Sequence, residues 1–174
     1  MNIKIIDNAI DISSQNLIID SLLGNQKTFP WYYRKDITDS HRKNNQHRPG
    51  LGHYFFLKET IYSSEYVHLL EPIIKKYINK KIIQCRSFLQ FPLNPKTIGK
   101  EIDTPHIDSD KPHQVFLYYV VSSDGHTIFY DNNKIIKKVK PQQGRLVIFP
   151  GNIYHSAEQP KKDVRCIINF DVNI

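Results

Sequence analysis

The sequence predicts an α+β fold that is mainly β, with supporting helices in the N-terminal part and a β-sandwich or barrel after them. Helix-like apolar spacing is confined to residues 1–81, short strand-like segments crowd residues 82–174, and turn-forming residues separate these segments. Short strands at such spacing are typical of sandwiches and barrels. Because 174 residues suit one core, we expect a single domain over 1–174, helix-rich over 1–81 and a β-barrel core over 82–174.

The N-terminal part begins with strand and helix signals. Residues 3–6 are strand-like, and Ser13 or Ser14 can cap a helix whose apolar residues continue until Gly24. A glycine directly after an apolar periodic segment is a common helix stop. Further strands are predicted at 31–33 and 53–57.

A second helix is predicted after Ser63 or Ser64. Its apolar residues recur at helical spacing as far as Ile78, which gives the helix one apolar face. Pro72 lies inside this pattern and should kink the helix, unless it belongs to the first turn, where proline is tolerated.

The remaining chain alternates between strand and turn signals. A strand over 82–91 and a loop over 92–104 are followed by seven strand candidates. These lie at 105–108, 114–121, 126–130, 134–139, 145–149, 153–156 and 164–172. The turns between them are marked by Ser-Asp-Gly at 123–125, Asp-Asn-Asn at 131–133, Pro-Gln-Gln-Gly at 141–144 and Pro-Gly at 150–151.

Composition excludes several classes of protein. No stretch approaches the roughly 18 consecutive apolar residues that a transmembrane helix needs, and the N-terminus has no signal-peptide pattern. We therefore predict a cytoplasmic protein that does not enter a membrane, with Cys85 and Cys166 as free thiols. The high Ile, Lys and Asn content favours an AT-rich source, bacterial or viral. The oligomeric state cannot be read from these patterns.

The net charge of +7 has two interpretations. It can describe a solvated lysine-rich surface, or it can indicate an acidic partner such as nucleic acid. One polar segment, residues 34–48, concentrates positive charge and lacks apolar periodicity, so we expect a long loop there. Its basic residues are Arg34, Lys35, His41, Arg42, Lys43, His47 and Arg48.

The motif with the clearest chemistry is Pro105-His106-Ile107-Asp108, followed by His155 after 49 residues. Residues two apart on a strand face the same side, so His106 and Asp108 can both point into the barrel. Two imidazoles and one carboxylate can occupy one face of Fe(II) and leave open coordination positions. His-x-Asp alone is a weak signal, because a lone histidine is more often a surface or core residue than a ligand.

The order of motifs around this pair strengthens the signal. After PHIDSD the chain reads QVFLYYVVSSDGHTIFYD, then KPQQGRLVIFPGNIYHSAEQP, then KKDVRCIINFDV. Over residues 105–172 this order resembles the prolyl 4-hydroxylase-like branch of the Fe(II)/2-oxoglutarate-dependent dioxygenases. The resemblance implies a double-stranded β-helix, a jelly-roll or cupin-like barrel.

The resemblance also implies roles for individual residues. His106, Asp108 and His155 correspond to the iron ligands, and these three are the implied catalytic set. Arg165 corresponds to the residue that pairs with the distal carboxylate of 2-oxoglutarate, a role that suits a planar guanidinium. Tyr119 corresponds to a tyrosine whose hydroxyl contacts the same carboxylate. The implied cofactors and co-substrates are Fe(II), 2-oxoglutarate and O2, with ascorbate as an additional candidate.

Some assignments stay open at this point. Tyr118 is the alternative to Tyr119, because neighbours on a strand face opposite sides. Phe91 stands where the family often has a tyrosine, so that hydrogen bond is expected to be absent. His113 is expected in a loop and His126 on a surface strand. Candidates for an apolar lining are Phe116, Ile128, Phe149 and either Ile167 or Phe170.

We expect a dioxygenase that hydroxylates a C–H bond, on a protein or peptide side chain such as proline, with release of succinate and CO2. The first alternative is an oxidative dealkylase of nucleic acid, which the basic segment favours. Cys166 to Ile174 contains no second arginine, however, and such dealkylases usually carry one there. The second alternative is a non-catalytic cupin-like binding module, which the complete set of ligands disfavours. A structural zinc site would need a fourth ligand and is usually rich in cysteine.

Overall fold

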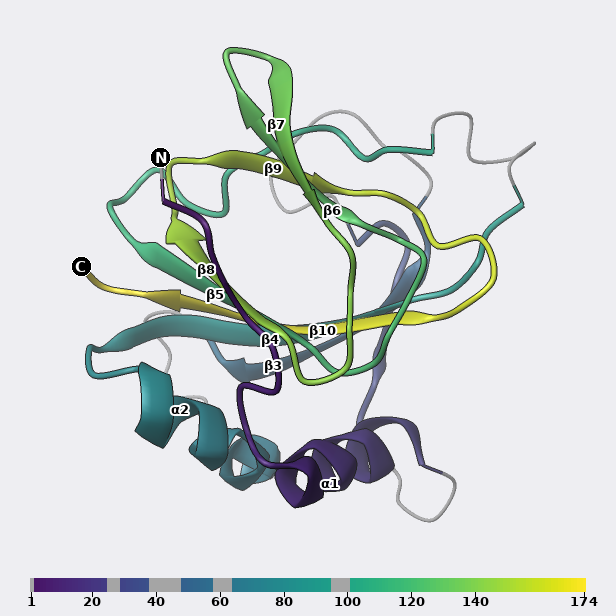
Figure 1. The fold of residues 1–174 in the computed structure, drawn as a ribbon. Coiled ribbons are helices and arrows are strands. Elements are labelled where there is room, and N and C mark those ends of the chain that lie inside the picture. Colours follow the sequence, from purple (N-terminus) through teal and green to yellow (C-terminus); the bar gives the residue numbers. More distant parts are fainter. Residues whose placement is uncertain (1, 25–28, 38–47, 58–63, 95–100) are drawn as a thin grey trace.

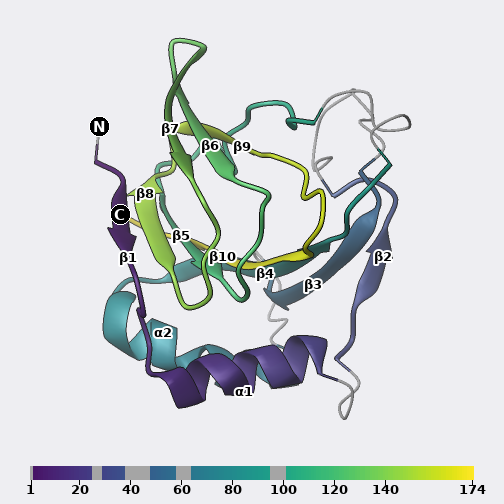
Figure 2. The same cartoon turned by 45° about the vertical axis from the view of Figure 1, so that its right-hand side comes forward.

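Two antiparallel β-sheets face each other and helices cover the outer side of the larger one (Figures 1 and 2). The computed structural model describes residues 2–24, 29–37, 48–57, 64–94 and 101–174. In spatial order the larger sheet contains β1 (Lys4–Ile6), β8 (Leu146–Pro150), β5 (Gln114–Tyr119), β10 (Arg165–Val172), β4 (Ile82–Gln90), β3 (Gly50–Phe56) and β2 (Tyr32–Arg34). The smaller sheet contains β7 (Lys134–Val139), β6 (Thr127–Asp131) and β9 (Tyr154–Ala157). This arrangement confirms the predicted mainly-β jelly roll with N-terminal supporting helices.

The helical layer consists of α1 (Ile12–Leu23), the 3-10 helix η1 (Glu65–Leu70) and α2 (Glu71–Tyr77). Its apolar residues, Ile18 and Ile73 among them, pack against side chains such as Phe55 and Phe170 on the outer face of the larger sheet. Each large apolar side chain that is fully buried contributes roughly 1.5–3 kcal/mol. Helices and sheet therefore hold each other in place through this core.

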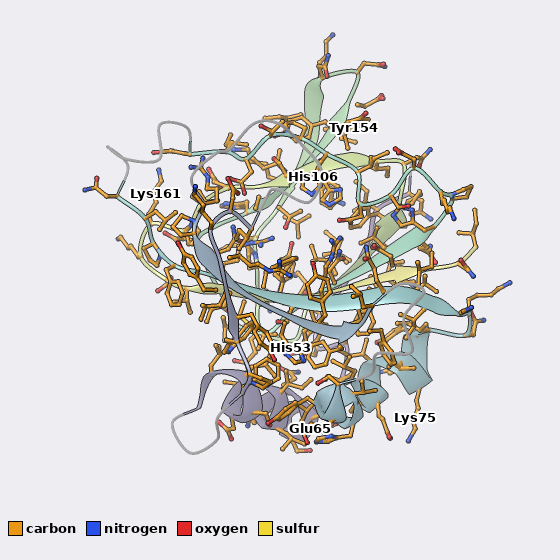
Figure 3. The ribbon with its side chains drawn as sticks, turned by 180° about the vertical axis from the view of Figure 1, so that it is seen from behind. His53, Glu65, Lys75, His106, Tyr154 and Lys161 are labelled. Carbon is orange, nitrogen blue, oxygen red and sulfur yellow. The ribbon has the colours of Figure 1, made fainter. Side chains whose placement is uncertain are left out.

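A second core lies between the two sheets. It includes Leu117 and Tyr119 from β5, Phe149 from β8, Phe129 from β6 and Ile167 from β10. Because side chains alternate along a strand, the same strands supply both cores. Figure 3 shows His106 between the sheets, with Glu65 and Lys75 on the helices beyond the larger sheet.

Helix α1 begins earlier than the serines predict. Its cap is Asp11, whose backbone is extended and whose Oδ1 accepts a hydrogen bond from the Ser14 N–H at 2.9 Å. The carboxylate of Asp11 is therefore the N-cap acceptor, the role that was predicted for Ser13 or Ser14. The predicted end at Gly24 is confirmed.

The second helix is divided at the point where Pro72 occurs. Ser64 caps η1 by accepting from the Tyr66 N–H at 3.2 Å, and α2 then begins at Glu71. Pro72 lies in the first turn of α2, where its missing N–H leaves no hydrogen bond unmade. The proline thus separates two short helices instead of kinking a single long one.

The strand predicted at 105–108 is wrong. Among the described residues, this segment forms only an isolated bridge, in which His106 and His155 exchange two backbone hydrogen bonds of 2.9 Å. Pro105 has no N–H to extend the ladder. The other strand predictions agree with the structure to within two residues at most ends, and Cys85 and Cys166 are buried free thiols as predicted. No helix in the described ranges has the length and apolar character that crossing a bilayer requires.

Candidate metal centre

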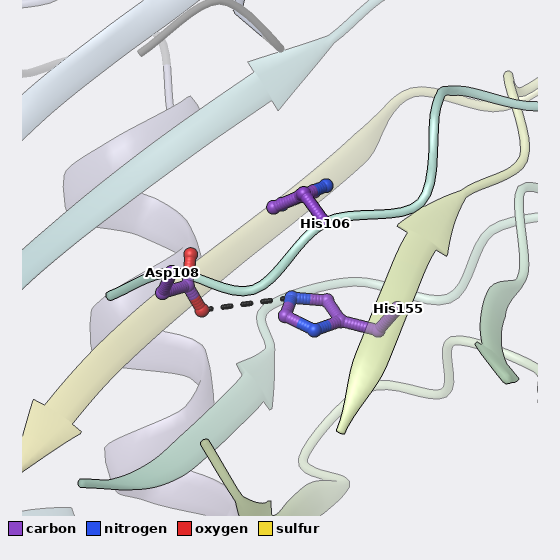
Figure 4. Close-up of side chains that lie close together, drawn as sticks. All are labelled: His106, Asp108 and His155. Carbon is purple, nitrogen blue, oxygen red and sulfur yellow. Dashed lines mark ion pairs between the residues drawn. The ribbon is translucent and has the colours of Figure 1, made fainter. Parts of the chain in front are cut away.

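His106, Asp108 and His155 meet between the two sheets (Figure 4). One nitrogen or oxygen atom from each lies within 4.8 Å of the others, and Asp108 Oδ2 is 3.5 Å from His155 Nε2. The bridge between His106 and His155 brings the two rings together, with centroids 4.7 Å apart. Asp108 follows two residues later and reaches the same point, so the structure brings together all three predicted ligands.

Both histidines are oriented by the backbone. Nδ1 of His106 lies 3.2 Å from the carbonyl oxygen of Thr104, and Nδ1 of His155 lies 3.2 Å from that of Ile153. A carbonyl can only accept, so each Nδ1 carries the proton when the ring is neutral. The lone pair is then on Nε2, which is the arrangement of a histidine prepared to bind a metal.

The charges of the cluster also suit a cation. Burial, followed by the neighbouring His155, lowers the pKa of His106 to about 4, so its ring is neutral near pH 7. Burial alone would raise the pKa of Asp108, but Arg86, His155 and His106 together hold it below its usual value. Because metal ligands must be deprotonated, His106 and Asp108 can accept a metal without first losing protons.

The donor set fits Fe(II) better than structural zinc. Two imidazoles and a carboxylate on one side of a pocket of about 900 Å³ leave space for further ligands on the other side. Fe(II) in oxygenases uses this set with open positions, whereas structural zinc prefers four closed ligands. No cysteine joins the cluster within the described ranges.

Arg165 lines the same pocket and is 4% exposed. Its Nε donates to the Gly125 carbonyl at 3.1 Å, one terminal nitrogen to Gln90 Oε1 at 2.6 Å, and the other to Thr127 Oγ1 at 2.9 Å. These contacts use three of the five N–H groups of a guanidinium. No carboxylate among the described residues forms an ion pair with Arg165. A buried cation with two remaining donors is suited to an acidic ligand.

Tyr119, and not Tyr118, faces Arg165. The Tyr119 hydroxyl donates to Thr127 Oγ1 at 2.7 Å, and its ring centre is 5.9 Å from the Arg165 guanidinium carbon. Burial raises the pKa of Tyr119, so the hydroxyl remains protonated and can donate. Tyr118 belongs to the core on the helix side.

Gln90, and not Phe91, contacts Arg165. Phe91 is 40% exposed, whereas Gln90 is buried and accepts a hydrogen bond from Arg165. Gln90 pairs in register with Arg165 across β4 and β10, so the two side chains lie on the same face of the sheet. The polar contact with Arg165 on this strand is therefore made by the Gln90 amide.

The apolar lining is partly as predicted. Phe149 and Ile167 line the pocket, and Leu117 and Phe88 also contribute. Phe116 and Phe170 instead belong to the core on the helix side, because they alternate with the inward residues of β5 and β10. Ile128 is buried but does not line the pocket.

The described residues of the basic segment 34–48 have different surroundings. Arg48 is 1% exposed, and its Nε donates to Asp103 Oδ1 at 2.7 Å, so its expected role as a surface contact for an acidic partner is wrong. Arg34 belongs to β2 and its guanidinium lies over the Tyr54 ring. Residues 38–47, which include His41, Arg42, Lys43 and His47, lie outside the described residues.

The two other histidines of the β half have different surroundings. His126 is partly exposed, as predicted, and its Nδ1 lies 2.7 Å from Glu158 Oε2. His113 precedes β5 in a loop, as predicted, but its side chain is buried and its Nε2 has no partner among the described residues. Gly151 permits this packing, because a Cβ there would lie 2.2 Å from the His113 ring.

Sequence reasoning missed several polar residues of the pocket. Gln90 and Thr127 hold Arg165, while Arg86 and Asn169 contact Asp108. The available signal was the period of two along each strand, because Asn169 lies four residues after Arg165 and Arg86 four before Gln90. Polar residues at inward positions of buried strands indicate a site, but the pairing register was needed to group them.

Comparisons with solved structures agree with this fold. An oxidoreductase of the 2OG-Fe(II) oxygenase family from Burkholderia pseudomallei superposes with a TM-score of 0.69 at 8% identity, covering 98% of this chain and 84% of that one. A Trichoplax adhaerens prolyl hydroxylase in complex with a peptide fragment of the hypoxia inducible factor oxygen degradation domain gives 0.67 at 16% identity, with 98% and 83% covered. The viral collagen prolyl hydroxylase of Paramecium Bursaria Chlorella virus-1, in complex with 2-oxoglutarate, gives 0.63 at 13% identity, with 100% and 97% covered.

No protein-family model matches this sequence, and no curated protein matches it. At these low identities the superpositions define the fold alone. What this chain shares with them is the fold and not the sequence. The chain therefore has the double-stranded β-helix fold of the 2OG-Fe(II) oxygenases, a fold that prolyl hydroxylases also have.

Proposed function

We propose that this protein is an Fe(II)- and 2-oxoglutarate-dependent dioxygenase that hydroxylates a C–H bond, through a single domain over residues 1–174. The observation that carries the proposal is that a three-ligand cluster and a buried guanidinium line the same pocket. His106, Asp108 and His155 form the cluster, and Arg165 carries the guanidinium. A metal chelated by a 2-oxo acid with a distal carboxylate requires both.

In this proposal His106, Asp108 and His155 hold the iron. Arg165 binds the distal carboxylate of 2-oxoglutarate, and Thr127 and Gln90 keep its guanidinium in place. Tyr119 supports Thr127 through its hydroxyl. When bound, iron and 2-oxoglutarate supply the activation of O2, with succinate and CO2 as products.

The pocket also has apolar lining residues. Phe88, Leu117, Phe149 and Ile167 line it together with the polar side chains. Apolar side chains in a pocket wall help to exclude water, which strengthens the charge interactions within the pocket.

We propose a protein or peptide side chain, such as proline, as the substrate. Support comes from the likeness to prolyl hydroxylases, one of which is in complex with a peptide. Beyond the metal ligands the pocket continues to residues that include Arg34, Tyr54, Leu57 and Lys111, which would contact such a substrate. Alkylated nucleic acid is the alternative, and the net charge of +7 supports it.

The test measures succinate release with Fe(II), 2-oxoglutarate, O2 and ascorbate, against proline-containing peptides and methylated oligonucleotides in parallel. We expect succinate release to depend on a peptide, and His106→Ala and Asp108→Ala to abolish it. His68→Ala is the matched control. His68 lies in η1, away from the pocket, and its side chain hydrogen-bonds to the Glu65 carbonyl. Release that depends on an oligonucleotide instead would favour the dealkylase. Unchanged turnover in either ligand variant would reject the metal centre.

A further inference from the structure

A row of four polar side chains lies beneath the candidate metal ligands, on the inner faces of β4 and β10. Arg86 pairs in register with Asn169, and Gln84 pairs with Asp171. All four line the pocket, and Arg86, Asn169 and Asp171 are at most 7% exposed. A buried arginine is costly unless its charge is paired, so its partners indicate why it is there.

The partners of Arg86 are two carboxylates. One terminal nitrogen, Nη2, donates to Asp108 Oδ1, and the same nitrogen lies 3.7 Å from Asp171 Oδ2. Gln84 in turn donates to Asp171 Oδ2. On the other side, Asn169 Nδ2 lies 3.3 Å from Asp108 Oδ2. Two donors, Arg86 and Asn169, therefore hold Asp108, and Asp171 in turn holds Arg86.

The two oxygens of Asp108 have different surroundings as a result. Oδ1 accepts a charge-assisted hydrogen bond from Arg86, while Oδ2 is the oxygen that lies 3.5 Å from His155 Nε2. A metal shared with His155 is reached through Oδ2. Oδ1 stays with the guanidinium, so Asp108 would offer one oxygen and not two.

The ring nitrogen of His113 and the carboxylates of Asp108 and Asp171 form another group of atoms within 4.8 Å of one another. Arg86 contacts both of these carboxylates. The guanidinium of Arg86 is therefore the cation that neutralises these two carboxylates, and the carboxylates hold Arg86 in place.

We propose that Arg86 is a positioning residue that holds Asp108 as a single-oxygen metal ligand, with Asp171 fixing Arg86 in turn. The inference rests on the proposed metal centre and deepens it. Six-coordinate iron with three protein ligands has three positions for other ligands only if each protein ligand occupies one. A carboxylate that bound through both oxygens would take one of those positions. Removing a group that orients a metal ligand in this way typically weakens metal affinity about 10- to 100-fold.

The test replaces Arg86 with methionine, which keeps the length of the side chain and removes its charge and donors. The affinity of the purified protein for Co(II) is measured by competition with a chelator, and the visible spectrum of the Co(II) protein is recorded. We expect Arg86→Met to bind Co(II) about 10- to 100-fold more weakly, the usual effect of removing such a partner, with a changed spectrum. Arg86→Lys should recover part of the affinity, because an ammonium can still donate to Oδ1.

Two further variants keep the result interpretable. Asp171→Asn leaves Arg86 in place but loosens it, so a smaller loss in the same direction is expected even if Arg86→Met folds poorly. Arg145→Met is the matched control, because Arg145 pairs with Asp7 outside the pocket and its loss should leave Co(II) affinity unchanged.

Each alternative gives a different result. Unchanged Co(II) affinity and spectrum in a less stable Arg86→Met protein would show an ion pair that only supports the fold. Tighter Co(II) binding would show that Arg86 competes with the metal for Asp108, and would also overturn the proposal. If the unaltered protein bound no Co(II), the metal centre itself would fail, and the role of Arg86 with it. That outcome is distinct, because it appears before any substitution is made.

Discussion

Arg165, the proposed anchor for 2-oxoglutarate, can be tested by substitution. Arg165 has two N–H groups left after its contacts with Gly125, Gln90 and Thr127, one on each terminal nitrogen. Those two groups match the two oxygens of a carboxylate. Replacing Arg165 with methionine would leave the bound carboxylate buried without a counter-charge, which costs about 2–5 kcal/mol. At 1.4 kcal/mol per factor of ten, the Kd for 2-oxoglutarate should rise about 30- to 4000-fold.

The lysine variant separates charge from geometry. Arg165→Lys keeps a positive charge but loses one arm of the fork, and a hydrogen bond to a charged group contributes about 1.5–3 kcal/mol. We expect the Kd for 2-oxoglutarate to rise about 10- to 100-fold in this variant. The methionine variant should therefore bind more weakly than the lysine variant.

The assay is anaerobic calorimetry of 2-oxoglutarate binding to Co(II)-loaded protein. Pyruvate provides the control ligand, because it has the same 2-oxo acid group but no distal carboxylate. Its affinity should not change in either variant. The reasoning is refuted if Arg165→Met weakens 2-oxoglutarate binding by less than about threefold, which is below the smallest loss that a buried unpaired charge allows. An equal loss for pyruvate would instead indicate a distorted pocket.

Two other predictions concern protonation and packing. Because burial and His155 lower the pKa of His106 to about 4, NMR titration of the metal-free protein should place its midpoint well below the ordinary 6.5. Between pH 6.5 and about 4 the unfolded chain binds more protons than the folded chain, so His106 destabilises the fold as the pH falls through this range. A titration midpoint of His106 at or above 6.5 would contradict the argument. Phe170→Ala should lower the free energy of unfolding by about 3–5 kcal/mol without changing 2-oxoglutarate affinity, because Phe170 packs towards the helices. Ile167→Ala should lower it by about 2–5 kcal/mol and also weaken 2-oxoglutarate binding, because Ile167 lines the pocket. Urea unfolding and calorimetry measure both effects, and equal effects of the two variants on affinity would show that the two faces of β10 are assigned wrongly.

The agreement between sequence and structure has a local origin. The positions of strands and helices depend on apolar periodicity and on turn residues, which neighbouring residues determine. The end of α1 at Gly24 and the strand containing Arg165 were predicted correctly for this reason. The ligand cluster was also predicted, although the reason given for His106 and Asp108 was wrong. The two residues do not share a regular strand; a single bridge between His106 and His155 brings the ligands together.

The disagreements arise where contacts between distant residues decide the outcome. Arg48 was interpreted as a surface charge, but Asp103, 55 residues later, pairs with it in the interior. The cap of α1 was assigned wrongly for a local reason, because Asp11, Ser13 and Ser14 lie close together and all three residue types favour the N-cap position. Propensity and composition do not distinguish a solvated arginine from a buried paired one.

By itself, the sequence determined a mainly-β fold with helices in its N-terminal part, and it singled out three metal-ligand candidates and Arg165. The fold follows from local periodicity, whereas the candidates follow from side-chain chemistry together with the family resemblance. Only the tertiary structure decided that Gln90 and Thr127 hold Arg165, and that Arg86 and Asn169 hold Asp108. The register between β4 and β10 places Gln90 beside Arg165 and Arg86 beside Asn169, and that register depends on pairing strands more than 70 residues apart. Thr127 comes from β6 in the facing sheet.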